Sequence, residues 1–188
     1  MLVLCRHGRT IANAAGRLQG RLDQPLDAEG VRQAQAVAEA IGTPDLLVSS
    51  PLLRACQTAD AYGIEYTIDD RWIELDYGQW EGWPLQDVPA ETWATWRGDN
   101  EFAAPDGETL TMLDRRVRQA CDELVDTARD ATVVVVSHVS PIKAAVAWAL
   151  DHDVRMSWRC RLDQAAVCRI EMTASGPSLV TFNQVYWS

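Results

Sequence analysis

Polar and basic residues follow directly after three short apolar runs in this sequence. The first run ends in Arg6-His7-Gly8-Arg9-Thr10, the second in Ser49-Ser50-Pro51-Leu52-Leu53-Arg54, and the third in Ser137-His138. Each run is aliphatic without polar alternation, which is typical of a strand buried on both faces of a parallel sheet. Because ligands bind at the carboxyl ends of strands in open α/β sheets, we expect these polar residues to form one site.

The arginines in and between these segments indicate a site for an anion. Arg54 falls in the first turn of a helix predicted to start at Ser50-Pro51, so its guanidinium adds to the positive end of the helix dipole. Such an arrangement holds a phosphate or a carboxylate. Further arginines add positive charge nearby in the sequence: Arg6, Arg9, Arg17 and Arg21. For the last three, a solvated surface position is an equally good interpretation.

The overall charge limits the partners that the chain can have. Its 188 residues include 17 Lys+Arg against 27 Asp+Glu, which gives a formal net charge of −10. Long-range repulsion disfavours nucleic acid, so we expect no nucleic-acid partner and an anion held by local positive charge. No apolar run approaches the ~20 residues of a membrane span. Met1 leads into Leu2-Val3-Leu4 without a basic segment, so we expect no signal peptide, no membrane partner and a cytoplasmic protein.

Cysteine and histidine usage argues against a disulfide framework and against a metal centre. Five cysteines are an odd number, and they are widely spaced without a Cys-x-x-Cys pair. Reduced, buried thiols are the expected state. With three histidines in the chain, a histidine-rich metal site is disfavoured. We therefore predict no metal and no cofactor.

The remaining segments supply the elements that must position the polar residues. Asp27 and Gly42 have the residue types that begin and end a helix, and the helix between them connects the first two apolar runs. Strand, helix, strand implies a right-handed βαβ unit and an α/β fold. The predicted strands cover residues 2–5, 45–49, 132–137, 165–172 and 178–183. The predicted helices cover residues 27–42, 50–61, 91–97, 109–129 and 140–150.

Residues 72–108 differ in composition from the rest of the chain. Tryptophan is concentrated there among Gly, Pro and acidic residues, at Trp72, Trp80, Trp83, Trp93 and Trp96. A Trp-rich stretch is more often packing than ligand contact, because each ring buries a large apolar area. We predict a lid-like excursion from a single domain that spans residues 1–188.

Five motifs, in order and with compatible spacing, resemble those of the histidine phosphatases, also called the phosphoglycerate mutase-like superfamily. The resemblance runs nearly end to end. It rests on Arg6-His7-Gly8-Arg9-Thr10 with Asn13, on Leu18-Gln19-Gly20 through Asp23-Gln24-Pro25-Leu26 to Gly30, on Ser49-Ser50-Pro51-Leu52-Leu53-Arg54-Ala55 with Gln57-Thr58-Ala59, on Glu74-Leu75-Asp76-Tyr77-Gly78-Gln79-Trp80-Glu81-Gly82, and on Pro105-Asp106-Gly107-Glu108 with Ser137-His138. It implies a three-layer α/β/α sandwich around a mostly parallel six-stranded sheet.

The resemblance also implies a division of chemical roles. His7 would be the nucleophile that forms a phosphohistidine, with its other ring nitrogen held by a backbone carbonyl. Arg6, Arg54 and His138 would grip the phosphoryl oxygens, for which His138 would be protonated and His7 neutral. Glu74 would protonate the leaving oxygen and then deprotonate the attacking water. Asp76 and Glu81 share its segment and remain alternatives for that role.

Contacts to the substrate are implied less specifically. The resemblance assigns them to Thr10, Asn13, Gln19 and the backbone around Gly20, and we add Arg9 as a candidate at the same edge. Discrimination among phosphomonoesters would depend on side chains of the excursion, for which the candidates are Tyr77, Trp80, Trp83 and Arg97. The chain departs from the family pattern at Arg9, where an acidic residue or Gln is frequent, at Ile73, where Arg is frequent, and at Val139-Ser140, where Gly is common.

Three functions are compatible with these residues. The first is a metal-independent phosphatase that hydrolyses a small phosphomonoester, a phosphorylated metabolite, through a phosphohistidine intermediate. The second is a phosphoglycerate mutase-type phosphotransferase, and the third is a non-catalytic or protein-phosphatase regulatory member. We favour the first because mutases of this superfamily tend to have a larger excursion than residues 83–107 provide. The oligomeric state stays open, with a homodimer as one option.

Overall fold

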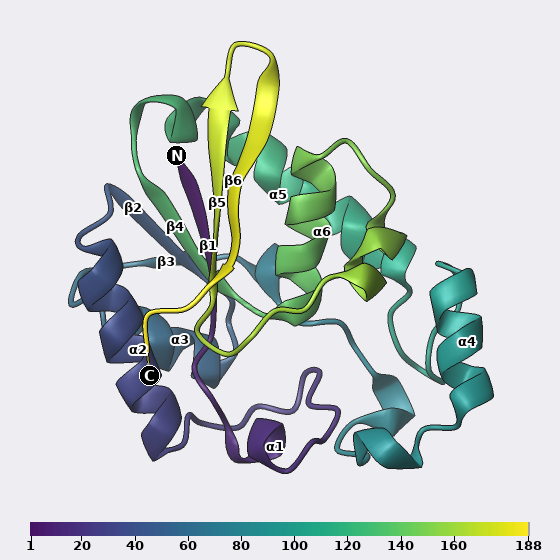
Figure 1. Cartoon of the computed structure of the whole chain (residues 1–188). Coiled ribbons are helices and arrows are strands. Elements are labelled where there is room, and N and C mark those ends of the chain that lie inside the picture. Colours follow the sequence, from purple (N-terminus) through teal and green to yellow (C-terminus); the bar gives the residue numbers. More distant parts are fainter. Residues whose placement is uncertain (188) are drawn as a thin grey trace.

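A computed structural model describes residues 1–187 and places six strands in one sheet (Figure 1). The strands are β1 (Leu2–Arg6), β2 (Leu46–Ser49), β3 (Thr67–Ile68), β4 (Val133–Ser137), β5 (Val167–Thr173) and β6 (Gly176–Gln184), in the spatial order β3-β2-β4-β1-β5-β6. The first four strands are mutually parallel, β5 is antiparallel to β1, and β6 is antiparallel to β5. The mostly parallel six-stranded sheet is confirmed. The edge strand β3 has only two residues and carries no apolar run by which the sequence could have shown it.

Strand register brings the polar segments to one edge of the sheet. Arg6 lies opposite Ser137, and Ser49 lies opposite Val136, so β1, β4 and β2 end side by side. The residues that follow these strands therefore meet, as expected for the carboxyl edge of parallel strands.

Helices cover both faces of the sheet, which confirms the three-layer sandwich. One face packs Val3 and Val134 against α2 (Ala28–Ile41) and α3 (Leu53–Asp60). The other packs Leu4 and Val135 against α5 (Leu110–Asp130) and α6 (Val139–Ala149). Alternate residues of β1 and β4 thus enter opposite cores, which explains their continuous apolar runs.

The ends of α2, α4 (Ala90–Gly98) and α5 follow the sequence to within one residue, whereas the helix after β2 starts later than predicted. Asp27 caps α2 by accepting the Gly30 N–H at 2.8 Å, and Gly42 ends the helix at φ 77°, both as predicted. The helix after β2 begins at Leu53 rather than at Pro51, and the Ser50 hydroxyl, which lies 2.6 Å from His138, accepts the Leu52 N–H at 3.4 Å ahead of the helix. The helix after β4 begins at Val139, which places Pro141 in its first turn, where proline is tolerated.

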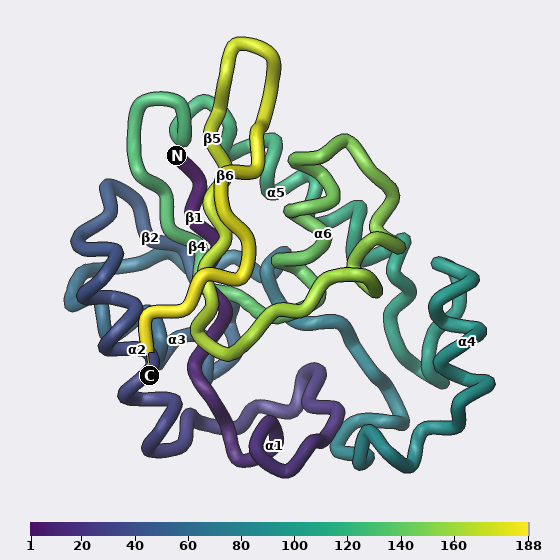
Figure 2. The backbone as a smooth tube through the Cα atoms, viewed as in Figure 1, coloured from purple at the N-terminus to yellow at the C-terminus, as the bar shows by residue number. Residues whose placement is uncertain are grey.

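Residues 72–108 leave the sheet and return to α5, carrying α4 (Ala90–Gly98) at the outer edge of the molecule (Figure 2). Trp72 and Trp96 are fully buried, and the Trp96 ring contacts a group of aromatic rings at centroid distances of 5.5–6.1 Å. Packing is therefore the role of these rings, as predicted. The excursion is tied to the segment after α1 (Ile11–Ala14), because Leu18 and Trp83 pair through their backbones at 2.9 Å.

The cysteines and the lengths of the helices complete the description of residues 1–187. The five cysteines are all free thiols, and three of them are buried. Within residues 1–187, no helix is both long and apolar enough to cross a membrane.

Candidate active site

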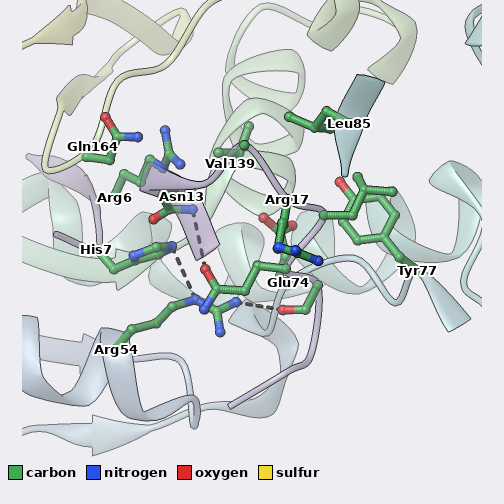
Figure 3. Close-up of a pocket in the computed structure, with 14 residues that line it drawn as sticks. Arg6, His7, Asn13, Arg17, Arg54, Glu74, Tyr77, Leu85, Val139 and Gln164 are labelled. Atoms are coloured by element: carbon green, nitrogen blue, oxygen red, sulfur yellow. Dashed lines mark hydrogen bonds between the residues drawn. The ribbon is translucent and has the colours of Figure 1, made fainter. Parts of the chain in front are cut away.

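A cavity of about 280 Å³ opens at the carboxyl edge of β1 (Figure 3). Eight of the eleven residues singled out from the sequence line it: Arg6, His7, Asn13, Gln19, Gly20, Arg54, Glu74 and Tyr77. They come from the segment after β1, from α3 and from the start of the excursion. The fold therefore gathers residues that are up to about seventy positions apart in the chain into one polar pocket.

His7 is held in one orientation by contacts to both ring nitrogens. Its Nδ1 lies 2.7 Å from the Gly8 carbonyl oxygen, so Nδ1 donates and Nε2 keeps its lone pair. Arg54 Nε donates to that Nε2 at 3.2 Å. Burial lowers the pKa of His7 well below 6.5, and the cations Arg54 and Arg6 lower it further. His7 is thus a neutral imidazole with a lone pair at the cavity.

Two glycines explain how closely the segment after β1 sits on α2. A Cβ on Gly8 would lie 2.3 Å from the Gly30 carbonyl oxygen, and a Cβ on Gly30 would lie 2.0 Å from the Arg9 carbonyl oxygen. Neither position accepts a side chain without a backbone shift. This contact fixes the turn that carries His7.

Arg54 is oriented by backbone carbonyls of the loop that contains Gly20. Its terminal nitrogens donate to Gly20 O at 2.6 Å and to Leu22 O at 2.8 Å. The loop is held from its other side by Glu81, whose carboxylate accepts the backbone N–H groups of Arg21 and Leu22 at 2.6 and 2.7 Å. Arg54 is therefore a preorganised cation beside His7.

Two donors at the cavity lack an acceptor within residues 1–187. Arg6 donates through Nη1 to Leu162 O at 2.6 Å, but its buried Nε has no partner. Gln19 accepts the Thr10 hydroxyl at 2.7 Å through Oε1, and its buried Nε2 has no partner. Burial lowers the pKa of Arg6 and of Arg54 to about 10, so both stay cationic at neutral pH. Unpaired donors beside two cations fit a bound anion.

His138 packs next to His7 and does not line the cavity. The two ring centroids are 5.0 Å apart, and the Nε2 atom of His138 is 2.6 Å from the Ser50 hydroxyl. Burial lowers its pKa well below 6.5, and Arg54, His7 and Arg6 lower it further. The expected protonated His138 therefore does not hold for the ligand-free protein. A phosphate dianion nearby would favour the protonated form.

Glu74 is the acid that reaches the cavity. Its Oε1 accepts the backbone N–H of Leu75 at 2.7 Å and that of Ser140 at 3.2 Å, and the side chain is buried. Ser140 belongs to the first turn of α6, so a backbone N–H at the start of this helix holds the carboxylate in place.

The two alternative acids are engaged elsewhere. Asp76 accepts the Gly78 N–H at 2.8 Å and pairs with Arg21 at 3.2 Å. Both oxygens of Glu81 accept backbone N–H groups, as described above, and neither acid lines the cavity. Geometry therefore favours Glu74 for proton transfer.

Some residues expected at the site lie away from the cavity. Arg9 pairs with Asp27 at 2.8 Å, since the helix cap supplies the nearer carboxylate. Thr10 is fully buried and contacts Gln19, so its position is one of support. Arg97 lies 5.9 Å from the centroid of the Trp158 ring, outside the cavity. Among the candidates from the excursion, only Tyr77 lines it.

Arg17, for which the sequence left an anion site and a solvated surface position equally open, also lines the cavity, and its guanidinium donates to Gly82 O of the excursion at 2.8 Å. Sequence reasoning did not assign several other lining residues to the site. Gln164 follows no motif and comes from the segment before β5. Further lining residues are Gly16, Leu18, Leu85 and Val139.

The two buried histidines predict that acid destabilises the fold. Their lowered pKa values mean that the unfolded chain binds protons near pH 6.5, where the folded chain does not. The free energy of unfolding should therefore fall as the pH drops from about 7.5 to about 5.5. Urea unfolding at both pH values measures this.

Matched variants test whether His7 and His138 cause this pH dependence. Replacing the exposed His152 with Gln should leave the pH dependence unchanged, whereas replacing His7 and His138 with Gln should flatten it. An equal slope in all three proteins would contradict the assignment.

A model of the "Histidine phosphatase superfamily (branch 1)" matches residues 2–185. A bifunctional protein of Mycobacterium tuberculosis is 36% identical over 95% of this chain, which spans 52% of that protein. Among solved structures, a phosphoserine phosphatase mutant from Entamoeba histolytica in complex with phosphoserine aligns with a TM-score of 0.89 at 28% identity, covering 97% of this chain and 95% of that one.

A mycobacterial glucosyl-3-phosphoglycerate phosphatase in complex with VO3 aligns with a TM-score of 0.86 at 33% identity, covering 97% and 98% of the two chains. The sheet order, the motifs after β1, β2 and β4, and the family model agree along nearly the whole chain. This chain belongs to the histidine phosphatase superfamily, branch 1.

Proposed function

We propose that the chain is a phosphatase that hydrolyses a small phosphomonoester, without a metal, through a phosphohistidine on His7 Nε2. The observation that carries the proposal is the neutral His7, whose Nε2 lone pair faces two arginines and unpaired donors in one cavity. In this arrangement a phosphoryl group would meet a nucleophile and cations at the same point.

The proposed reaction has two steps that use the same groups. In the first, Nε2 attacks phosphorus, the ester P–O bond breaks, and Glu74 gives its proton to the leaving oxygen. In the second, water attacks phosphorus, Glu74 takes a proton from the water, and the P–N bond breaks to release inorganic phosphate. Arg6 and Arg54 would stabilise the phosphoryl oxygens in both steps, and His138 would contribute once protonated.

The substrate class is a small phosphorylated metabolite. The similar proteins named above act on phosphoserine and on glucosyl-3-phosphoglycerate, both small phosphorylated molecules. A recessed cavity of about 280 Å³ suits such a molecule better than a phosphorylated side chain on a flat protein surface.

The test is release of inorganic phosphate, in excess EDTA, from 3-phosphoglycerate, sugar phosphates, nucleotides and an aryl phosphate assayed side by side. We expect strong release from one class and undiminished rates with EDTA. Loss of activity on chelation would overturn the metal-free mechanism. Interconversion of phosphoglycerates without phosphate release would instead establish a phosphotransferase, and an inert protein would indicate a non-catalytic site.

A further inference from the structure

A second, smaller cavity adjoins the catalytic one. It measures about 80 Å³ and shares two walls with the catalytic cavity, Tyr77 and Val139. The rest of its lining comes from the segment after Glu74, from α5 and α6 and from the turn before β5: Leu75, Leu110, Ser140, Lys143, Ser157 and Trp158. A group placed there would lie just beyond the catalytic pocket.

The charged residue of this cavity is Lys143, the single lysine of the chain. It is half-buried on α6, and its ammonium forms no hydrogen bond or ion pair within residues 1–187. Burial lowers its pKa, with Cys160 and Glu74 opposing the effect. Part of the hydration of this ammonium is therefore lost, and an anion bound in the cavity would compensate for that loss.

The other polar groups of the cavity are also donors. The indole N–H of Trp158 is buried and has no acceptor within the described residues. Ser140 and Ser157 add hydroxyl groups, and no Asp or Glu lines this cavity. The cavity therefore offers hydrogen-bond donors and one positive charge, without a carboxylate of its own.

The outer side of Trp158 is also cationic. Arg97, Arg155 and Arg159 surround a shallow depression there, and the Arg97 guanidinium lies over the Trp158 ring. Arg155 is paired with Asp153 at 3.2 Å, so the positive charge beside Trp158 in this chain of net charge −10 comes mainly from Arg97 and Arg159.

We propose that the Lys143 cavity binds a carboxylate of the substrate while the phosphate occupies the catalytic cavity. The proposal rests on the phosphatase function above and narrows its substrates to phosphomonoesters of short carboxylic acids. A volume of about 80 Å³ with a single cation has room and charge for a carboxylate, whereas a phosphate is larger and carries up to two negative charges.

The test compares two pairs of substrates that differ in the carboxylate. 3-Phosphoglycerate is matched by glycerol 3-phosphate, and phosphoserine by phosphoethanolamine. We expect wild type to prefer the acid of at least one pair in kcat/KM. Lys143→Met should lower kcat/KM for that acid by about tenfold or more, through KM, and leave its partner within about twofold. Lys143→Arg should restore part of the preference.

The controls separate binding from effects on the catalytic groups. Arg115→Met removes a charge from an exposed position of α5 and should change neither substrate. Equal losses for both members of the pair in Lys143→Met would mean that Lys143 acts on Glu74 or on the fold, and would overturn the subsite. A wild type that hydrolyses an aryl phosphate but shows no preference for either acid would overturn it as well.

A binding measurement keeps the inference testable even if the phosphatase proposal fails. Because the chain has one lysine, ¹³C or ¹⁵N labelling of lysine gives a single side-chain signal for Lys143. In a His7→Ala background, which is expected to prevent turnover, 3-phosphoglycerate or phosphoserine should shift this signal. Glycerol 3-phosphate and phosphoethanolamine, which lack the carboxylate, should not. No shift with either acid at concentrations that saturate binding would contradict the proposal.

Discussion

Replacing His7 with alanine is expected to lower kcat by at least about 10⁴-fold, because nothing else in the cavity can accept the phosphoryl group. The other side chains of the cavity are guanidinium, amide, carboxylate, phenol and aliphatic groups, and none of them is an imidazole. His138 cannot substitute for it, since its Nε2 contacts the Ser50 hydroxyl and the ring does not line the cavity. Steady-state hydrolysis of an aryl phosphate measures the loss.

The control is His152→Ala, which removes an exposed imidazole and should leave kcat unchanged. To detect the intermediate, the reaction is quenched during turnover with base rather than with acid, because a phosphohistidine is hydrolysed in acid and survives in base. Intact-protein mass should then show one added phosphoryl group in wild type and none in His7→Ala. A variant that keeps most of the wild-type rate would remove His7 from the nucleophilic role.

The fold could be predicted from the sequence wherever burial alone determines the pattern. The valine run 133–136 is apolar throughout because alternate residues enter the two cores, and the ends of α2 follow from Asp27 and Gly42. The start of α3 could not be predicted in the same way. Ser50 is a good helix-capping residue by type, but its hydroxyl contacts His138 and accepts the Leu52 N–H ahead of the helix, while the distant Asp23 accepts the N–H of Leu53.

The site residues also fall into those that a local sequence pattern predicts and those that only tertiary contacts determine. Residues next to strand ends, such as His7 and Arg54, could be placed because parallel strands end together. Arg9 was misplaced because its partner, Asp27, is set by the packing of the β1 turn on α2. Gln164 and Lys143 enter through tertiary contacts between segments distant in sequence, and no local pattern identifies them.

Glu74→Gln is expected to slow esters with poor leaving groups by about 10²–10⁴-fold, and an aryl phosphate far less. The amide keeps the size of the side chain and can still accept the Leu75 and Ser140 N–H groups through its oxygen, so the pocket should retain its shape. What is lost is the proton for the leaving oxygen, which an alkyl alcohol needs and an aryl oxide largely does not. The ratio of kcat/KM for glycerol 3-phosphate and for the aryl ester measures this difference.

Glu171→Gln makes the same chemical change at an exposed position of β5, and it should alter neither rate. Equal losses on both esters in Glu74→Gln would argue that the residue binds rather than transfers a proton. The role would then pass to Asp76 or Glu81, although each would first have to leave its present partners. With Asp76 paired to Arg21 and Glu81 holding two backbone N–H groups, such a release would break the loop that orients Arg54. The dependence on the leaving group therefore tests whether Glu74 is the proton donor and whether Asp76 and Glu81 keep their present partners.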